Sequence, residues 1–100
     1  MLIGPTSAFA EGEQREIRAG KQRVLVLKHR GEVYALRNVC THESFPLLGG
    51  EVEGGAITCA QHGARFDLQT GRALCLPAIK AVRTFPVETE AGLLYLRVEP

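Results

Sequence analysis

The chain has 100 residues, of which 45% are hydrophobic, and it carries 12 Lys and Arg against 11 Asp and Glu. This length supports one domain with a modest apolar core. The near-neutral balance gives no basic excess to attract nucleic acid or an anionic membrane. No apolar run approaches the roughly 20 residues of a membrane span, and the N-terminus lacks the features of a signal peptide, so we expect a cytoplasmic protein.

The first third of the chain predicts short strands. Residues 4–13 form an irregular entry with at most one short strand, and residues 14–18 alternate in polarity. Residues 21–28 give the clearest strand, because four consecutive branched apolar residues at their centre fit a short strand better than a helix. A tight turn over 29–32 then leads to a partner strand over 33–36, which completes a hairpin.

The middle of the chain predicts a loop followed by short strands. Residues 43–55 contain the pairs Gly49-Gly50 and Gly54-Gly55, which allow positive backbone angles and close approach. Short strands are expected over 56–58 and 65–68, with a turn over 68–72.

The C-terminal part predicts a closing hairpin. Residues 81–88 and 93–98 form its strands and 89–92 its turn, with Pro86 marking an edge or a bulge because proline cannot donate to a ladder. No stretch has a helical period over three turns. The fold class expected is therefore all-β, an antiparallel β sandwich or open barrel.

Two short clusters of possible metal ligands interrupt this pattern. Cys40-Thr41-His42 is followed, after 16 residues, by Cys59-Ala60-Gln61-His62. A structural zinc site accepts two Cys and two His, but its paired ligands are usually two to four residues apart, and Cys40 and His42 are closer. An iron–sulfur cluster of the Rieske type also takes two Cys, on one iron, and two His, on the other.

These residues resemble the Rieske [2Fe–2S] signature, from Cys40-Thr41-His42 to Cys59-Ala60-Gln61-His62-Gly63. Phe66-Asp67-Leu68-Gln69-Thr70-Gly71 and Leu76-Pro77 resemble the run that follows it in Rieske ferredoxins. The resemblance covers roughly residues 20–98. It implies a single domain over 1–100, in which 1–38 and 73–100 form the β-sandwich base and an inserted loop-rich subdomain, 39–72, binds the cluster.

The resemblance also implies the ligands of one [2Fe–2S] cluster. Cys40 and Cys59 would bind the inner iron as thiolates, and His42 and His62 the outer iron as imidazoles. Both histidines would lie at the exposed tip of the domain, where a partner protein can approach the outer iron.

The reduction potential can be anticipated from neighbouring residues. In high-potential Rieske proteins of respiratory complexes a Ser and a Tyr donate hydrogen bonds to the cluster, and a disulfide ties the two loops. The matching residues here are Ala64 and Phe66, which have no hydroxyl, and Phe45 and Gln61, which cannot form a disulfide. We therefore expect a potential from roughly −150 mV up to near zero.

Other residues with reactive or charged side chains have simpler interpretations. Cys75, between two leucines, is expected to be a buried small hydrophobe. His29 is expected to be solvated in the hairpin turn, and Glu11, Glu13 and Glu16 to form a solvated face.

Two groups of residues near the motif leave two interpretations open. Arg65 and Arg72 either form plain surface salt bridges or face the reduced cluster or an acidic partner. Phe45-Pro46 and Leu47-Leu48 either cap the cluster against water or are ordinary core.

The residues predict an electron carrier rather than an enzyme, because the sequence has no spare Cys/His dyad and no phosphate-binding loop. The resemblance implies a soluble Rieske-type ferredoxin between an NAD(P)H-dependent reductase and a terminal oxygenase or other acceptor. Two alternatives remain: a small electron-transfer subunit of a nitrite-reductase-like or dioxygenase-like complex, and a zinc-stabilised interaction domain.

Overall fold

The computed structural model describes residues 1–41, 45–61, 63–76 and 80–97. Strands dominate these residues, and none of the helical segments among them is long and apolar enough to cross a membrane. The elements are β1 (Leu2–Pro5), the 3-10 turn η1 (Thr6–Ala8), β2 (Gln14–Ala19), β3 (Gln22–His29), β4 (Glu32–Arg37), β5 (Glu51–Glu53), β6 (Ala56–Thr58), β7 (Arg65–Asp67), β8 (Thr84–Phe85), β9 (Val87–Glu90) and β10 (Leu93–Leu96).

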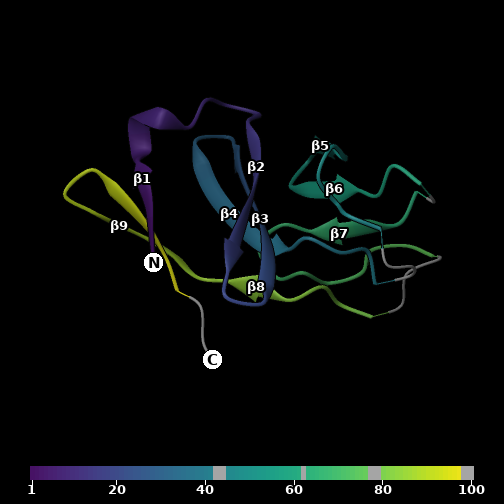
Figure 1. Cartoon of the computed structure of the whole chain (residues 1–100). Coiled ribbons are helices and arrows are strands. Elements are labelled where there is room, and N and C mark those ends of the chain that lie inside the picture. The colour runs from purple at the N-terminus through teal and green to yellow at the C-terminus, as the bar shows by residue number, and fades with distance from the viewer. Residues whose placement is uncertain (42–44, 62, 77–79, 98–100) are drawn as a thin grey trace.

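These strands form three antiparallel sheets. The terminal sheet has the order β1-β10-β9, the central sheet β2-β3-β4-β8, and the small sheet β5-β6-β7. Figure 1 shows the central sheet in the middle, with the terminal sheet on one side and the small sheet on the other. The all-β, antiparallel fold class predicted from the sequence is confirmed.

Strand β3 is buried on both faces, which explains its unbroken apolar run. Its central residues Val24, Leu25, Val26 and Leu27 are at most 1% exposed. Val24 and Val26 pack with residues of the terminal sheet, whereas Leu25 and Leu27 pack with residues of the small sheet. Because successive side chains of a strand point to opposite faces, a strand covered on both sides needs apolar residues at every position.

Three hairpins close through turns in which both central residues have positive φ, among them the β5–β6 turn at Gly54 and Gly55. Arg30 (54°) and Gly31 (79°) join β3 to β4, and Ala91 (51°) and Gly92 (77°) join β9 to β10. This backbone is that of a type I′ turn, whose twist matches the flanking strands. The predicted turn over residues 29–32 is therefore confirmed.

The expected single strand over residues 81–88 is wrong. The structure divides it at Pro86 into β8, which pairs with β4 in the central sheet, and β9, which pairs with β10 in the terminal sheet. Proline has no N–H to continue a ladder, so the chain leaves one sheet there and enters the other. The closing hairpin is correspondingly shorter than predicted.

The segment over residues 43–55 holds a strand that the sequence did not predict. Strand β5 has one apolar residue of three, too little for a pattern, and it pairs with β6. The glycines behave as expected: Gly54 and Gly55 have φ of 61° and 81° in the β5–β6 turn. A Cβ at Gly50 would lie 2.4 Å from the Thr58 carbonyl oxygen, so only glycine allows this close approach.

Candidate metal centre

Two loops of the same construction begin at Cys40 and Cys59. The backbone N–H of Cys40 donates to the carbonyl oxygen of Phe45, and that of Cys59 to the carbonyl oxygen of Ala64, both at 2.7 Å. Each bond joins the first and last residues of a six-residue loop, and each cysteine is only 1% exposed. The two loops, 40–45 and 59–64, are called the ligand loops below.

The structure brings the two predicted thiol ligands into one buried cluster, because Cys40 and Cys59 both belong to the apolar core between the central and small sheets. The predicted imidazole ligands, His42 and His62, lie outside the described residues. In the part of the chain that is described, no group of three or more His, Cys, Asp or Glu could hold a metal. Ligation by the two histidines therefore stays a prediction.

The chemistry of the described donors fits an iron–sulfur cluster. Cys40 and Cys59 share one apolar core, yet neither forms a disulfide. The thiolate is the form of cysteine that binds metal, and an uncompensated charge in an apolar core is costly. A positively charged iron compensates two such thiolates. Cys40 precedes His42 by two residues and Cys59 precedes His62 by three, so each ligand loop carries one of each donor.

The residues expected to set the potential are buried in this core. Ala64 and Phe66 are 0% exposed and belong to the same buried cluster as both cysteines. Neither side chain can donate a hydrogen bond to a sulfur. These two residues therefore supply no hydroxyl beside the cysteines, and the low potential stays a prediction.

A third segment crosses both ligand loops. The Thr41 hydroxyl donates to the carbonyl oxygen of Lys80 at 2.7 Å. The thiol of Cys75 donates to the carbonyl oxygen of Gly63 at 3.5 Å. The chain after β7 therefore contacts the first ligand loop at one end and the second at the other.

The expected burial of Cys75 is wrong. Cys75 is exposed, and its neighbours Leu74 and Leu76 are 46% and 77% exposed. Apolar neighbours failed as a guide because this segment runs over the surface of the ligand loops rather than into the core.

Among the described residues, four exposed apolar side chains come from the first ligand loop or from chain segments next to the loops. Phe45 is 38% and Leu48 43% exposed, and together with Leu74 and Leu76 they are called the apolar tip. Leu47, between the first two, is 0% exposed and packs in the core with both cysteines. The core interpretation is confirmed for Leu47, and capping of the cluster by its neighbours stays a prediction.

Asn38 was missed by the sequence reasoning and anchors the first ligand loop. It is 2% exposed, its Oδ1 accepts the N–H of Leu48 at 2.9 Å, and its Nδ2 donates to Glu16. Its own N–H donates to the carbonyl oxygen of Arg23. The side-chain amide and the backbone N–H of Asn38 thus tie both ends of the 38–48 segment to the central sheet. The available signal was its place between the predicted strand and Cys40.

The three N-terminal glutamates accept hydrogen bonds within the chain and keep contact with solvent, with Glu11 exposed and Glu13 and Glu16 partly buried. Glu11 accepts the N–H groups of Gly31 and Arg30 in the β3–β4 turn, and these bonds, that of Gly31 first, lower its pKa. The N–H of Ala10 lowers the pKa of Glu13 in the same way. The Arg23 guanidinium, followed by the Asn38 amide, lowers that of Glu16.

His29 is half-buried, not simply solvated in its turn. Its Nε2 accepts the N–H of Gly55 at 3.3 Å. Gly55 belongs to the β5–β6 turn, so this bond links the small sheet to the end of β3. His29 thus holds two sheets together.

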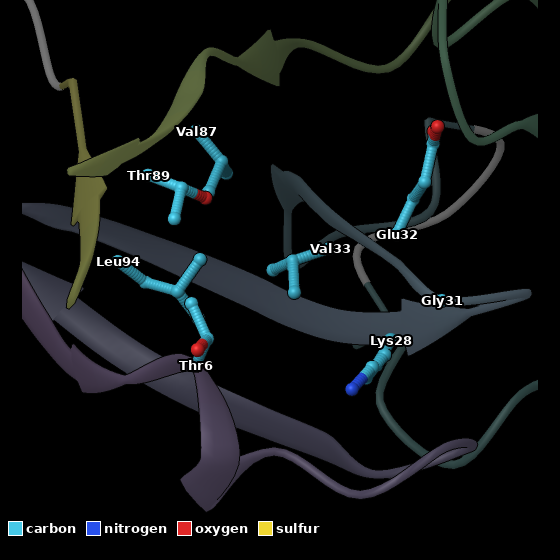
Figure 2. Close-up of a pocket in the computed structure, with 8 residues that line it drawn as sticks. All are labelled: Thr6, Lys28, Gly31, Glu32, Val33, Val87, Thr89 and Leu94. Carbon is cyan, nitrogen blue, oxygen red and sulfur yellow. The ribbon is translucent and has the colours of Figure 1, made fainter. Parts of the chain in front are cut away.

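A cavity elsewhere contains none of the predicted site residues. Figure 2 shows this cavity, of about 280 Å³, between the central and terminal sheets. Lys28 lines it, and the Lys28 ammonium donates to the carbonyl oxygen of Phe9 at 3.2 Å. The other lining residues are Thr6, Gly31, Glu32, Val33, Val87, Thr89 and Leu94. Because both cysteines pack on the opposite face of the central sheet, this cavity is separate from the metal centre.

Comparison with known proteins agrees with the site. Residues 1–86 match the family model of the Rieske [2Fe–2S] domain. The ferredoxin component of the naphthalene 1,2-dioxygenase/salicylate 5-hydroxylase systems of Ralstonia sp is 36% identical over 89 residues, which is 89% of this chain and 86% of that protein. The ferredoxin component of the naphthalene 1,2-dioxygenase system of Pseudomonas putida is 37% identical over 84 residues, or 84% and 81% of the two chains.

Solved structures show the same likeness. The Sphingomonas yanoikuyae B1 ferredoxin is 29% identical with a TM-score of 0.88, over 99% of this chain and 98% of that one. A chain in a complex of reduced oxygenase and oxidized ferredoxin in carbazole 1,9a-dioxygenase is 28% identical with a TM-score of 0.89, over 97% and 100%. The chain therefore belongs to the Rieske [2Fe–2S] domain family and is an electron-transfer protein that holds one [2Fe–2S] cluster.

Proposed function

We propose that the ligand loops hold the two irons separately, with Cys40 and Cys59 on the inner iron and His42 and His62 on the outer iron. The observation that carries this assignment is the matched pair of loops, each starting at a buried cysteine and closed by the same backbone bond. The cluster supplies one-electron chemistry when bound. The chain itself positions the ligands and covers the inner side with apolar residues.

We further propose that this protein accepts one electron from an NAD(P)H-dependent reductase and passes it to a terminal oxygenase. Its support is the set of relatives that are ferredoxin components of dioxygenase systems, and a similar chain from a complex of ferredoxin with an oxygenase. The protein works in the cytoplasm. The division into a base, 1–38 and 73–100, and a cluster-binding subdomain, 39–72, belongs to the same proposal.

The spare cysteine and the spare histidine provide matched controls for the ligand assignment. Ser replaces each cysteine in turn, and Ala each histidine. Loss of the visible absorption and of about two irons and two sulfides per chain is expected for the variants at residues 40, 42, 59 and 62. Cys75→Ser and His29→Ala should keep both. A protein in which Cys75→Ser loses the cluster while Cys40→Ser keeps it contradicts the assignment.

Electron transfer is tested with a defined acceptor. The holoprotein is reduced with dithionite, freed of excess reductant, and mixed with the terminal oxygenase of carbazole 1,9a-dioxygenase from Nocardioides aromaticivorans IC177. The expected result is recovery of the oxidised visible spectrum of this chain at a rate that rises with oxygenase concentration. A rate no faster than in buffer alone argues against a carrier for this type of oxygenase.

Voltammetry of the same holoprotein tests the low potential. A midpoint between roughly −150 mV and zero is expected. A value near the upper end of the Rieske range, about +300 mV, would show that the absence of hydroxyls at Ala64 and Phe66 does not govern the potential. A colourless sample with one zinc and no iron would overturn the carrier function altogether.

A further inference from the structure

Five exposed cations gather at one end of the central sheet. They come from the β2–β3 hairpin, the end of β4 and the segment before β8, and are called the basic rim: Arg18, Lys21, Arg23, Arg37 and Arg83. Glu16 bonds Arg23 at 2.8 Å and lies 3.9 Å from Arg18. Among the described residues, the other three rim cations take part in no ion pair. A chain with a net charge of only +1 therefore concentrates positive charge at this end.

Strand register places like charges directly opposite each other on this rim. Arg18 on β2 faces Arg23 on β3. The β4–β8 ladder pairs Leu36 with Thr84, and the N–H of Arg37 donates to the carbonyl oxygen of Arg83 at 2.8 Å, so these two arginines are the next pair. Like charges directly opposite in a sheet are destabilising. An anionic surface that covers the rim removes this repulsion.

The rim surrounds a hollow of about 240 Å³. Lys21, Arg23 and Arg37 line it, together with Asn38 and Val39. Its cationic lining suits a carboxylate, which accepts hydrogen bonds from Lys and Arg. The hollow therefore offers an anion both charge and donors, whereas an apolar group would gain neither.

Two arginines of the basic rim lie close in the chain to residues of the first ligand loop or to a residue bonded to it. Arg37 is three residues before Cys40 in the chain, and Asn38, which lines the hollow, also accepts the N–H of Leu48 in the apolar tip. On the other side, Arg83 is three residues after Lys80, whose carbonyl oxygen bonds Thr41. Three residues span at most about 11 Å, so a protein bound at Arg37 lies near the first ligand loop, although Arg37, opposite Val24, is on the sheet face away from the cysteines.

The cluster-binding part of the chain has no comparable charge. Residues 39–80 hold three cations, Arg65, Arg72 and Lys80, against four carboxylates, Glu43, Glu51, Glu53 and Asp67. The apolar tip can supply contact area but no electrostatic attraction. Charges that raise the rate of association are unbalanced ones, and the basic rim carries such charge whereas residues 39–80 do not.

We propose that the basic rim docks an acidic surface of the protein that exchanges electrons with this chain, with a carboxylate of that partner in the hollow. The identity of the occupant as a redox partner rests on the proposed function. Its acidic character rests on the rim alone. The rim steers and orients the partner, and the apolar tip makes the contact next to the ligand loops.

The test measures binding of fluorescently labelled octaglutamate to the holoprotein by anisotropy, at low salt and at 150 mM salt. Binding is expected at low salt and should weaken as salt screens the charges. The rim variant R37Q/R83Q should raise Kd at least about fivefold, since two exposed charge contacts are lost. Labelled octalysine should not bind.

The variant R65Q/R72Q is the matched control, because it removes the same two charges of the same residue type from the cluster-binding part. It should keep Kd within about twofold. The visible spectrum and the thermal midpoint of both double variants show that they are folded and loaded. If a sample proves to hold no cluster, the carrier function fails. The peptide experiment still shows whether the basic rim binds an acidic chain.

Three results would overturn the proposal. Octaglutamate that shows no salt-dependent binding excludes an acidic occupant. Equal weakening in the rim variant and in R65Q/R72Q assigns the attraction to overall charge rather than to the rim. An eight-residue thymidylate that binds more tightly than octaglutamate, and loses its affinity in R37Q/R83Q, assigns the rim to nucleic acid.

Discussion

The central sheet and the ligand loops are held in place by different means. Strand β3 pairs with β2 and β4 along its length and is packed on both faces. Among the described residues, the first ligand loop is instead closed by the backbone bond of Cys40 and tied by Asn38, and the second is closed by the bonds of Cys59 with Ala64 and Gly63. The sheet is thus held by many interactions, so that the loss of one leaves the others, whereas the ligand loops depend on a few individual bonds. Substitutions in the two regions should therefore separate loss of the fold from loss of the cluster.

The largest effect is expected for Leu25→Ala in the central sheet. Leu25 is 0% exposed, so the truncation leaves a cavity and should cost about 2–5 kcal/mol of unfolding free energy. Leu76→Ala, at a residue 77% exposed, is the control and should stay within about 0.5 kcal/mol. Denaturant unfolding followed by circular dichroism measures both. Equal costs would mean that β3 is not the main source of stability.

Gly71→Ala tests a single tight contact beside the ligand loops. An added Cβ would lie 2.0 Å from the Val82 carbonyl oxygen, whereas at Gly92, with the same φ of +77°, nothing lies within 4 Å. Both variants strain the backbone, but only the first must also displace residue 82. Gly71→Ala should therefore cost about 1–3 kcal/mol more than Gly92→Ala. Thermal unfolding compares the pair, and equal midpoints would show that residue 82 moves freely.

Asn38→Ala should affect the cluster more than the fold. It leaves the N–H of Leu48 without its acceptor in a part-buried place, which costs about 1–3 kcal/mol, and it releases one end of the first ligand loop. We expect faster bleaching of the visible absorption in the presence of an iron chelator than for Leu25→Ala at a temperature where both are folded. Bleaching as slow as in the parent chain would mean that the cysteine bond alone holds the loop.

Periodicity and motif predicted the parts of the molecule that depend on local chemistry. The apolar run of β3, the turn at Arg30-Gly31 and the cysteines' place in loops follow from residue type and spacing. Contacts between distant segments could not be read this way: the change of sheet at Pro86, the bonds of Asn38 and the exposure of Cys75 depend on what packs nearby. The basic rim could not be predicted from the sequence, because the net charge of the chain does not say which charged residues the strand register brings together.

Arg37→Gln should stabilise the protein slightly, in contrast to the variants above. It relieves the repulsion between Arg37 and Arg83, whose backbones are bonded, and cross-strand pairs are worth roughly 0.2–1 kcal/mol. The gain should shrink at high salt. Arg97→Gln, which removes an ion pair with Glu88, is the control and should give no gain. A salt-independent change in midpoint would point to packing rather than charge.

The smallest effect is expected for the pH dependence of stability that comes from Asp67. The N–H of Thr70, then its hydroxyl, lower the pKa of Asp67 below its usual 3.8. A carboxylate with a lowered folded pKa stabilises the fold above the unfolded pKa and loses this contribution as pH falls through the folded value. The thermal midpoint of Asp67→Asn should therefore differ from that of the parent chain at neutral pH, and the difference should shrink as the pH falls through the lowered folded pKa of Asp67. A difference that persists below that pKa would reflect something other than ionisation.

The pairing of β1 with β10 has a consequence for biosynthesis. These strands lie at opposite ends of the chain yet are neighbours in the terminal sheet. Since a nascent chain emerges from its N-terminus, this sheet cannot form until residue 96 has left the ribosome. Until then one face of β3 has no cover. The terminal sheet is therefore the last of the three to be completed during synthesis, and a nascent chain from which β8 but not β10 has emerged would display both ligand cysteines on an unfinished domain.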